Sequence, residues 1–179
     1  MAESFVNSVT RAVGVVTSSS AGSVGVQTNL ITGITTTNVT VGDIVENSNF
    51  IAGTKVSSIG VNSTTCDRDS TNTTAATSRT VKYLGLTTAY TSASGTKSII
   101  IGGTFANNTS SSVNLTVEVH DASAGVQAAI ASKIPVPTGS SFVISDAGKT
   151  VLEAGDEVRV FCDTANALDV NLSILTGVS

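Results

Sequence analysis

The chain has 179 residues, of which 40% are hydrophobic, so it is long enough to bury the core of one large or two small domains. Its net charge of −4 argues against a nucleic-acid partner, because proteins neutralise phosphates with clustered lysine and arginine. No apolar run approaches the roughly 18 residues that cross a bilayer, and the N-terminus lacks a basic region followed by an apolar core. We therefore expect no membrane segment, no signal peptide, and folding in a cytoplasm.

The amino-acid types predict an all-β protein with many short strands. Thr, Val and Ile are favoured on pleated surfaces, and Ser, Gly and Asn are common in turns. The chain is rich in both groups, has 4% aromatic residues and lacks tryptophan. Its two cysteines, Cys66 and Cys162, lie far apart and have no CxxC-type neighbour. We expect two buried thiols, with a disulfide as the alternative.

Residues 1–16 are predicted to be an N-terminal arm or first strand. Their apolar residues recur at spacings of three and four, which also suits a short helix. The β-branched valines favour the extended conformation. The Ser- and Thr-rich stretch 17–22 that follows is typical of a turn.

Residues 17–83 are predicted to be a small β-module rich in Thr and Ser. Short apolar stretches alternate with Gly, Asn or Thr runs, as in a meander of short strands. Phe50 is the only aromatic residue between Ser23 and Val81, so we expect a thin core whose edges are completed by neighbours. The segment Ser63–Thr80 has almost nothing to bury. It is either a long exposed loop or a hairpin whose partner strands lie on another chain.

Residues 84–179 are predicted to be an antiparallel β-sandwich of the jelly-roll type. Ser98–Phe105 is a nearly continuous apolar run, typical of a buried strand, and Val113–His120 alternates like a strand with one buried face. The Asn- and Ser-rich loop Ala106–Ser112 predicts that these strands form an antiparallel hairpin. Gly102-Gly103 predicts a bulge or a close backbone contact.

The remainder of this domain is predicted to hold further short strands. Val126–Ala131 suits either one helical turn or an irregular strand. Ile134–Pro137 should be an edge strand, because its two prolines cannot donate to a ladder. Asp146–Lys149 predicts a turn. The alternating stretches Val158–Cys162 and Val170–Ile174 predict a second hairpin.

Short motifs in both halves are familiar from one class of protein. Between Thr91 and Leu175 they are Ser-Gly-Thr-Lys-Ser-Ile-Ile-Ile-Gly, Phe-Ala-Asn-Asn, Ile-Pro-Val-Pro-Thr-Gly-Ser-Ser, Lys-Thr-Val-Leu-Glu-Ala-Gly-Asp-Glu-Val-Arg-Val and Asp-Val-Asn-Leu-Ser-Ile-Leu. This set resembles small virion structural proteins of tailed bacteriophages, especially those that infect cyanobacteria. The stretches 41–45 and 51–59 are similar to a short β-module common in phage fibre and decoration proteins. The resemblance implies a non-enzymatic particle component with a β-sandwich and an inserted β-module.

We predict no catalytic, cofactor-binding or metal-binding residues. The single histidine, His120, falls on the wet face of its strand, and no Gly-X-Ser-X-Gly turn accompanies it. Asp67 and Asp69 offer carboxylates for calcium but lack the oxygen-rich pattern and closing glutamate of a calcium loop, so we expect a solvated loop with a local Asp–Arg contact. Glu153 and Asp156 surround a glycine turn and are expected to serve that turn rather than form an acid/base pair.

The leading functional hypothesis is a non-enzymatic structural component of a tailed-phage virion. It would be a capsid decoration (cement) protein or a head–tail neck or tail accessory protein, located in the virion and bound to other virion proteins and to its own copies. The alternative is a receptor- or glycan-binding phage fibre module, which requires exposed tyrosines in a groove, here Tyr83 and Tyr90. A third hypothesis, a hydrolase, would need His120, Glu153 or Asp156.

Overall fold

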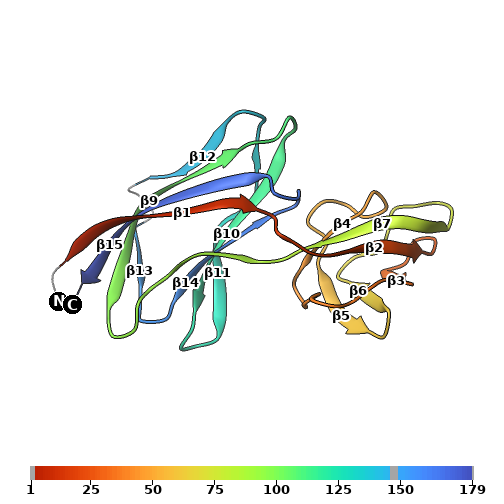
Figure 1. The fold of residues 1–179 in the computed structure, drawn as a ribbon, viewed down its shortest axis with the longest axis horizontal. Helices are drawn as coiled ribbons and strands as arrows, with labels where there is room; N and C mark the ends of the chain where they lie inside the picture. Colours follow the sequence, from red (N-terminus) through yellow and green to blue (C-terminus); the bar gives the residue numbers. More distant parts are fainter. Residues whose placement is uncertain (1–2, 146–148, 179) are drawn as a thin grey trace. The chain divides into compact units, whose positions relative to one another are not determined.

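The computed structural model describes residues 3–145 and 149–178 of the chain. Every regular element in these residues is a β-strand, and the paired strands run antiparallel (Figure 1), which confirms the predicted all-β fold. No helix in this part of the chain is long and apolar enough to cross a membrane. The strands are β1 (Ser4–Val13), β2 (Val16–Val24), β3 (Leu30–Thr32), β4 (Ile44–Glu46), β5 (Val56–Gly60), β6 (Ser63–Cys66), β7 (Ala76–Leu84), β8 (Thr87–Thr91), β9 (Lys97–Asn107), β10 (Val113–Asp121), β11 (Val126–Val136), β12 (Ser141–Ile144), β13 (Thr150–Leu152), β14 (Glu157–Cys162) and β15 (Leu168–Val178).

The chain forms two compact units. The first, which we call the sandwich unit, comprises Met1–Val13, Thr87–Val160 and Ala167–Ser179. The second, which we call the β-module, comprises Gly14–Leu86 and Phe161–Asn166. In the sequence, the main part of the β-module therefore follows β1 and precedes β8.

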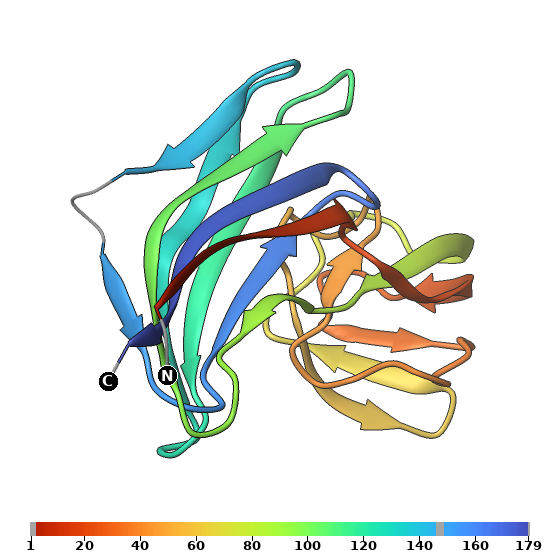
Figure 2. The ribbon, with the colours of Figure 1, turned by 60° about the vertical axis from the view of Figure 1, so that its left-hand side comes forward.

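Two sheets face each other in the sandwich unit (Figure 2). One has the strand order β1-β15-β9-β12, with β13 also paired to β9, and the other has the order β11-β10-β14-β8. Side chains alternate along each strand, so every second one points into the space between the sheets. The largest fully buried side chains of this unit include Ile100, Phe105, Leu115, Leu152, Leu168, Leu172 and Ile174.

The hairpin predicted from residues 98–120 is wrong, because its two strands lie in different sheets. β9 pairs with β15, β12 and β13, whereas β10 neighbours β11 and β14. A hairpin would leave both apolar faces on one side of a single sheet, whereas facing sheets bury them against each other. The buried Asn107 stabilises the crossing: its Nδ2 donates to the carbonyls of Ser111 and Val136, at 2.8 and 2.9 Å.

The second predicted hairpin, from residues 158–162 and 170–174, is wrong for the same reason. β14 belongs to the four-stranded sheet and β15 to the five-stranded sheet. The edge strand predicted at 134–137 is confirmed, since β11 ends at Val136 and is the outermost strand of its sheet. Val126–Ala131 also lies in β11, so the strand alternative holds there. The turn predicted at Asp146–Lys149 falls mostly outside the described residues.

β9 contains a bulge beside Gly102, as the sequence predicts for the Gly102-Gly103 pair. The pairing of β9 with β15 skips Ile101, which is the extra residue on β9. A Cβ atom at Gly103 would lie 2.8 Å from Cδ2 of Leu172. Glycine at this position therefore leaves room for the side chain of Leu172 on the neighbouring strand.

The six strands of the β-module form one sheet of order β4-β7-β2-β3-β6-β5. β2 runs through residues 17–22, so the turn predicted there is wrong. Small residues suit this strand because other side chains pack closely over it: a Cβ on Gly22 would lie 2.6 Å from Cγ2 of Ile34. The core cluster of the module consists of Val24, Ile31, Ile34, Val39, Val45, Phe50, Val56, Cys66, Val81 and Tyr83.

The segment 63–80 contributes two strands to this sheet. β6 pairs with β3 and β5, and β7 pairs with β2 and β4. The prediction that its partner strands lie on another chain is therefore wrong. Between the strands, the N–H of Ser70 donates to the carbonyl of Thr28 at 2.9 Å, which ties the loop to the module.

One type of turn occurs in both units. Gly42 and Gly155, with φ of 98° and 90°, precede Asp43 and Asp156. In each turn the aspartate N–H donates to the carbonyl three residues earlier, at 3.1 Å in both cases, and the carboxylate accepts the N–H of that earlier residue at 3.0 and 2.9 Å. Glycine is favoured before the aspartate because the position needs positive φ.

Candidate interaction surface

Asp156 and Glu153 serve the turn before β14. Asp156 is 5% exposed, and its two carboxylate oxygens accept the N–H groups of Ala122 and Glu153, at 3.0 and 2.9 Å. The Glu153 carboxylate lies 3.1 Å from Nζ of Lys97. The two acidic side chains thus have separate structural partners, as expected for turn residues.

His120 lies on β10, opposite Gln127 of β11. The side chain is half-buried, and its Nδ1 atom is buried without a hydrogen-bond partner, so it is less solvated than predicted. The adjacent Asp121 accepts the N–H groups of Ser123 and Ala124, both at 2.9 Å. The hydrogen bond from Ala124 is the main cause of the lowered pKa of Asp121. The carboxylate beside His120 is therefore engaged in the β10–β11 turn.

One of the two carboxylates in the loop after β6, that of Asp67, binds the β-module itself. Asp67 accepts the N–H of Lys55 at 2.8 Å, and its second oxygen lies 3.8 Å from Nε of Arg68, so the expected Asp–Arg contact is present. Asp69 is exposed. Within residues 3–145 and 149–178, no three His, Cys, Asp or Glu side chains come together as a metal site would require.

Both cysteines are free and buried, as the sequence predicts. Burial raises the pKa of Cys66 to about 12 and that of Cys162 to about 11. The thiolate is the nucleophilic form of cysteine. At neutral pH both side chains therefore remain unreactive thiols in the folded chain.

The two tyrosines do not form the exposed platform that the fibre hypothesis requires. Tyr83 is completely buried, and its hydroxyl lies 2.8 Å from Oγ1 of Thr64. Tyr90 is half-buried, and its hydroxyl lies 2.9 Å from Oγ of Ser98. Stacking on a sugar needs an exposed ring face, which Tyr83 lacks.

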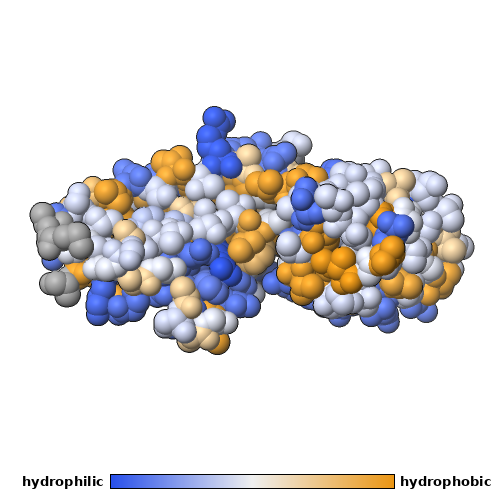
Figure 3. Space-filling model, turned by 60° about the horizontal axis from the view of Figure 1, so that its bottom comes forward, coloured by the Kyte–Doolittle hydropathy of each residue, from blue (hydrophilic) through white to orange (hydrophobic). Residues whose placement is uncertain are grey.

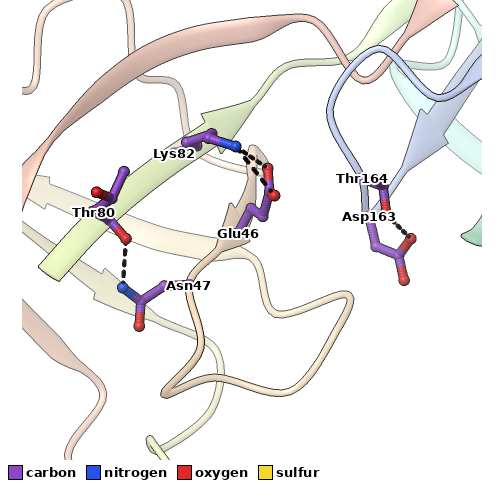
Figure 4. A network of polar contacts seen from close by, with 6 residues as sticks. All are labelled: Glu46, Asn47, Thr80, Lys82, Asp163 and Thr164. Carbon is purple, nitrogen blue, oxygen red and sulfur yellow. Dashed lines mark hydrogen bonds and ion pairs between the residues drawn. The ribbon is translucent and has the colours of Figure 1, made fainter. Parts of the chain in front are cut away.

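A shallow depression of about 530 Å³ lies on the β-module. Its polar groups contact one another (Figure 4): Nζ of Lys82 is 3.3 Å from Oε1 of Glu46, and Nδ2 of Asn47 donates to the carbonyl of Thr80 at 2.8 Å. Charges of both signs and an open shape suit a polar contact surface. Its lining residues are Val45, Glu46, Asn47, Ser48, Phe50, Ala52, Arg79, Thr80, Lys82 and Asp163.

The sheets also end in strands that have an open edge. β11 is the outermost strand of the four-stranded sheet and has 11 residues. Its second half carries two features that protect edges, Lys133 with a φ of 52° and Pro135. Its first half, residues 126–130, has no charged residue or proline, and Val126 is 58% exposed. The pairing with β10 skips Ile130, so the regular part of this half is residues 126–129. In an outermost strand, alternate backbone N–H and C=O groups point away from the sheet, where an additional strand can bind them.

Large apolar side chains are exposed in both units. On the face drawn in Figure 3, hydrophobic residues gather in separate patches among hydrophilic ones. Single exposed apolar residues are ordinary, but contiguous groups mark interaction sites. The most exposed examples are Phe5, Val9, Val41, Val61, Val126, Val143 and Val151.

No protein-family model and no curated protein matches this sequence. Among solved structures, the chain is similar to the crystal structure of the VP2 subviral particle of infectious bursal disease virus. The sequences are 10% identical, the TM-score is 0.29, and the match covers 97% of this chain and 71% of that chain. A TM-score this low carries no argument about fold or function.

Proposed function

We propose that this protein is a structural component of a tailed-phage virion that acts through protein–protein contacts. Its place is on the capsid, as a decoration or cement protein, or at the neck or tail. The motifs between Thr91 and Leu175 support this assignment by their resemblance to small phage virion proteins. The all-β architecture is consistent with it.

The observation that carries the proposal is the uncharged half of the β11 edge. Monomeric proteins block such edges with charge, proline or a covering segment, because an open edge pairs with other chains. Residues 126–130 contain neither a charged residue nor a proline. A neighbouring virion protein can add a strand at this edge in the assembled particle. Because this contact exists in the particle and not in the dissociated chain, it stabilises the assembled state by mass action.

The fibre alternative receives less support, because the buried hydroxyl and ring of Tyr83 are unavailable to a glycan. The depression on the β-module is polar and open, but its one aromatic lining residue, Phe50, is 7% exposed. A stacking site for sugars is thus absent from this group of lining residues.

Reconstitution tests the proposal. The purified chain is added to particles of its own phage and to particles stripped of accessory proteins, and the bound copies are counted by quantitative gel analysis and imaging. We expect saturable binding, either in many copies over the shell or in a small number at one vertex. The first pattern identifies a cement protein, and the second identifies a neck or tail part.

Two variants connect this test to the β11 edge. Ala128→Lys places a charge on the edge, and we expect it to weaken binding at least about tenfold because charged side chains discourage strand addition. Val61→Lys, at a position that is 92% exposed in the β-module, is the matched control. Absence of binding to particles, combined with binding to host cells, would overturn the proposal in favour of the fibre module.

A further inference from the structure

The five-stranded sheet has one face against the sandwich core and one face directed outward, which we call the outer face. The strand register places Phe5, Leu175, Ile99 and Val151 in one row across β1, β15, β9 and β13. Phe5 is 77% exposed, Val151 is 54% exposed, and the two central side chains are half-buried. This row is a contiguous apolar strip across the whole width of the sheet.

A second row crosses the same face farther along the strands. It consists of Val9, Asn171, Thr104 and Val143, on β1, β15, β9 and β12. Its two ends are the exposed apolar side chains, with Val9 at 67% and Val143 at 56%. Its centre is polar. In both rows, the exposed apolar side chains therefore lie at the two edges of the sheet, on β1 at one edge and on β12 or β13 at the other.

Ion pairs lie at the two ends of this face. Nε of Arg11 lies 3.8 Å from Oδ2 of Asp169, beyond the row of Val9. Nζ of Lys97 lies 3.1 Å from Oε1 of Glu153, beyond the row of Phe5. The apolar row of Phe5 and the charge-balanced ends of the face match the apolar centre and polar rim of a protein interface.

We infer that the outer face binds the outer face of a second copy of this chain, around a two-fold axis that is parallel to the strands and passes between β15 and β9. This axis exchanges the outer strands and keeps each row at its own height. Phe5 then packs against Val151 of the partner subunit, and Val9 packs against Val143 of the partner subunit. Asn171 meets Thr104 of the partner subunit, and their side chains can form a hydrogen bond.

The pattern of side chains favours this arrangement over an unrelated protein as the occupant. A two-fold interface must be complementary to itself. Here the larger Phe5 meets the smaller Val151, and the polar Asn171 meets the polar Thr104. Arg11 and Lys97 each have a counter-ion on their own chain, Asp169 and Glu153. No pair of like charges is brought together by the two rows.

The available area is also sufficient. β1, β15 and β9 have 10, 11 and 11 residues, and the fourth position holds β12 with 4 residues and β13 with 3. At about 3.4 Å per residue and about 4.8 Å between strands, these strands give a face of roughly 640 Å². Two such faces bury roughly 1,300 Å², which lies within the range of about 1,200–2,000 Å² for stable interfaces. Aligned packing of two sheets at about −30° accommodates the strand twist. This inference concerns self-association and does not depend on the virion assignment.

A charge exchange tests the inference in the full-length chain. Sedimentation velocity and equilibrium measure the dimerisation constants of the wild type, Phe5→Lys, Val151→Glu and the double variant. We expect a wild-type dimer and at least about tenfold weaker dimerisation for each single variant, since each buries an unpaired charge. In the double variant the new lysine of one subunit meets the new glutamate of the other, so dimerisation returns to within about threefold of wild type.

The two new charges cannot pair within one chain, because three strand spacings of about 4.8 Å separate them. Val61→Lys serves as the control, and we expect its dimerisation to equal that of the wild type. Circular dichroism checks that each variant is folded, and either single variant suffices if the other fails to fold. A wild type that stays monomeric up to roughly 100 µM, or a single variant that dimerises normally, overturns the inference. A double variant that stays as weak as the single variants also overturns it.

Discussion

The sandwich unit and the β-module each contain a turn of the same Gly-Asp type, but their buried side chains differ in chemistry. The large buried side chains of the sandwich unit, such as Phe105, Leu172 and Ile174, are purely apolar. In the β-module, the cluster includes Tyr83 and Cys66, whose polar atoms can lose a proton. The stability of the sandwich unit should therefore depend mainly on packing. That of the β-module should depend also on hydrogen bonding and pH.

The largest effect is expected from a cavity in the sandwich unit. Phe105 is completely buried, and its ring lies 6.1 Å from that of Phe142. Phe105→Ala should lower the free energy of unfolding by about 3–5 kcal/mol, because contacts are lost and the cavity collapses only partly. Chemical denaturation measures the change, and hydrogen exchange followed by mass spectrometry assigns it to the sandwich unit.

Phe142→Ala is the matched control, because the half-buried Phe142 already contacts solvent. We expect about half the effect or less, since less apolar surface is returned to water. Equal losses for the two variants would show that packing around Phe105 does not dominate the sandwich core.

Alkaline pH should lower the stability of the β-module. Burial raises the pKa of Tyr83 from 10.0 to about 12 and that of Cys66 from 9.0 to about 12. Between about pH 9 and 12, the unfolded chain has released protons that the folded β-module still holds, so the free energy of unfolding falls as pH rises. Below pH 9 this contribution to stability is complete.

Denaturation at a series of pH values measures this slope, and the absorbance of tyrosinate reports the release of the Tyr83 proton. Hydrogen exchange should show faster opening of the β-module than of the sandwich unit above about pH 9. Cys66→Ala should reduce the slope, because one of the titrating groups is removed. An identical pH dependence in the two units would contradict the comparison.

The Gly-Asp turns should respond alike in the two units, but by different amounts. Asp43 accepts hydrogen bonds from the N–H and hydroxyl of Thr40 and from the hydroxyl of Thr17, at 2.7 to 3.0 Å. Asp156 accepts two backbone N–H groups. Each Asp→Ala variant should lose at least about 2 kcal/mol, and Asp43→Ala should lose more than Asp156→Ala.

Denaturation of both alanine variants, beside Asp43→Asn and Asp156→Asn, separates charge from hydrogen-bonding geometry. The asparagine side chain keeps one acceptor oxygen, so we expect these variants to retain part of the lost stability. A larger loss for Asp156→Ala than for Asp43→Ala would show that the count of hydrogen bonds does not rank the two turns.

Most strands of the sandwich unit were predictable, but their pairing was not. Alternation in residues 113–120 shows which face of β10 is buried, and it fits a hairpin and a crossing between sheets equally well. The two possibilities differ in which element packs on the buried face of β10. In this chain it is the opposite sheet of the sandwich unit, which contains β9. Asn107 at the crossing reads as an ordinary turn residue in the sequence, although its amide joins two segments that are distant in the chain.

The β-module shows a second limit of sequence analysis. The run of small, polar residues in β2 resembles a turn in the sequence. The strand is buried at Gly22 by the side chains of Ile31, Ile34 and Val81, which come from other parts of the β-module. Its own side chains therefore give little sign of the strand. The outer face could not be found from the sequence either. Phe5, Ile99, Val151 and Leu175 are far apart in the chain, and only the register of four strands aligns them.

The smallest expected effect concerns one buried hydrogen bond in the β-module. Tyr83→Phe removes the hydroxyl that lies 2.8 Å from Oγ1 of Thr64 and leaves that buried oxygen without its partner. We expect a loss of about 1–2 kcal/mol in the free energy of unfolding. Adding Thr64→Val removes the unpaired oxygen as well, so the double variant should regain most of the loss. A double-mutant cycle at neutral pH measures the coupling; additive losses would mean that packing alone stabilises the β-module at this point.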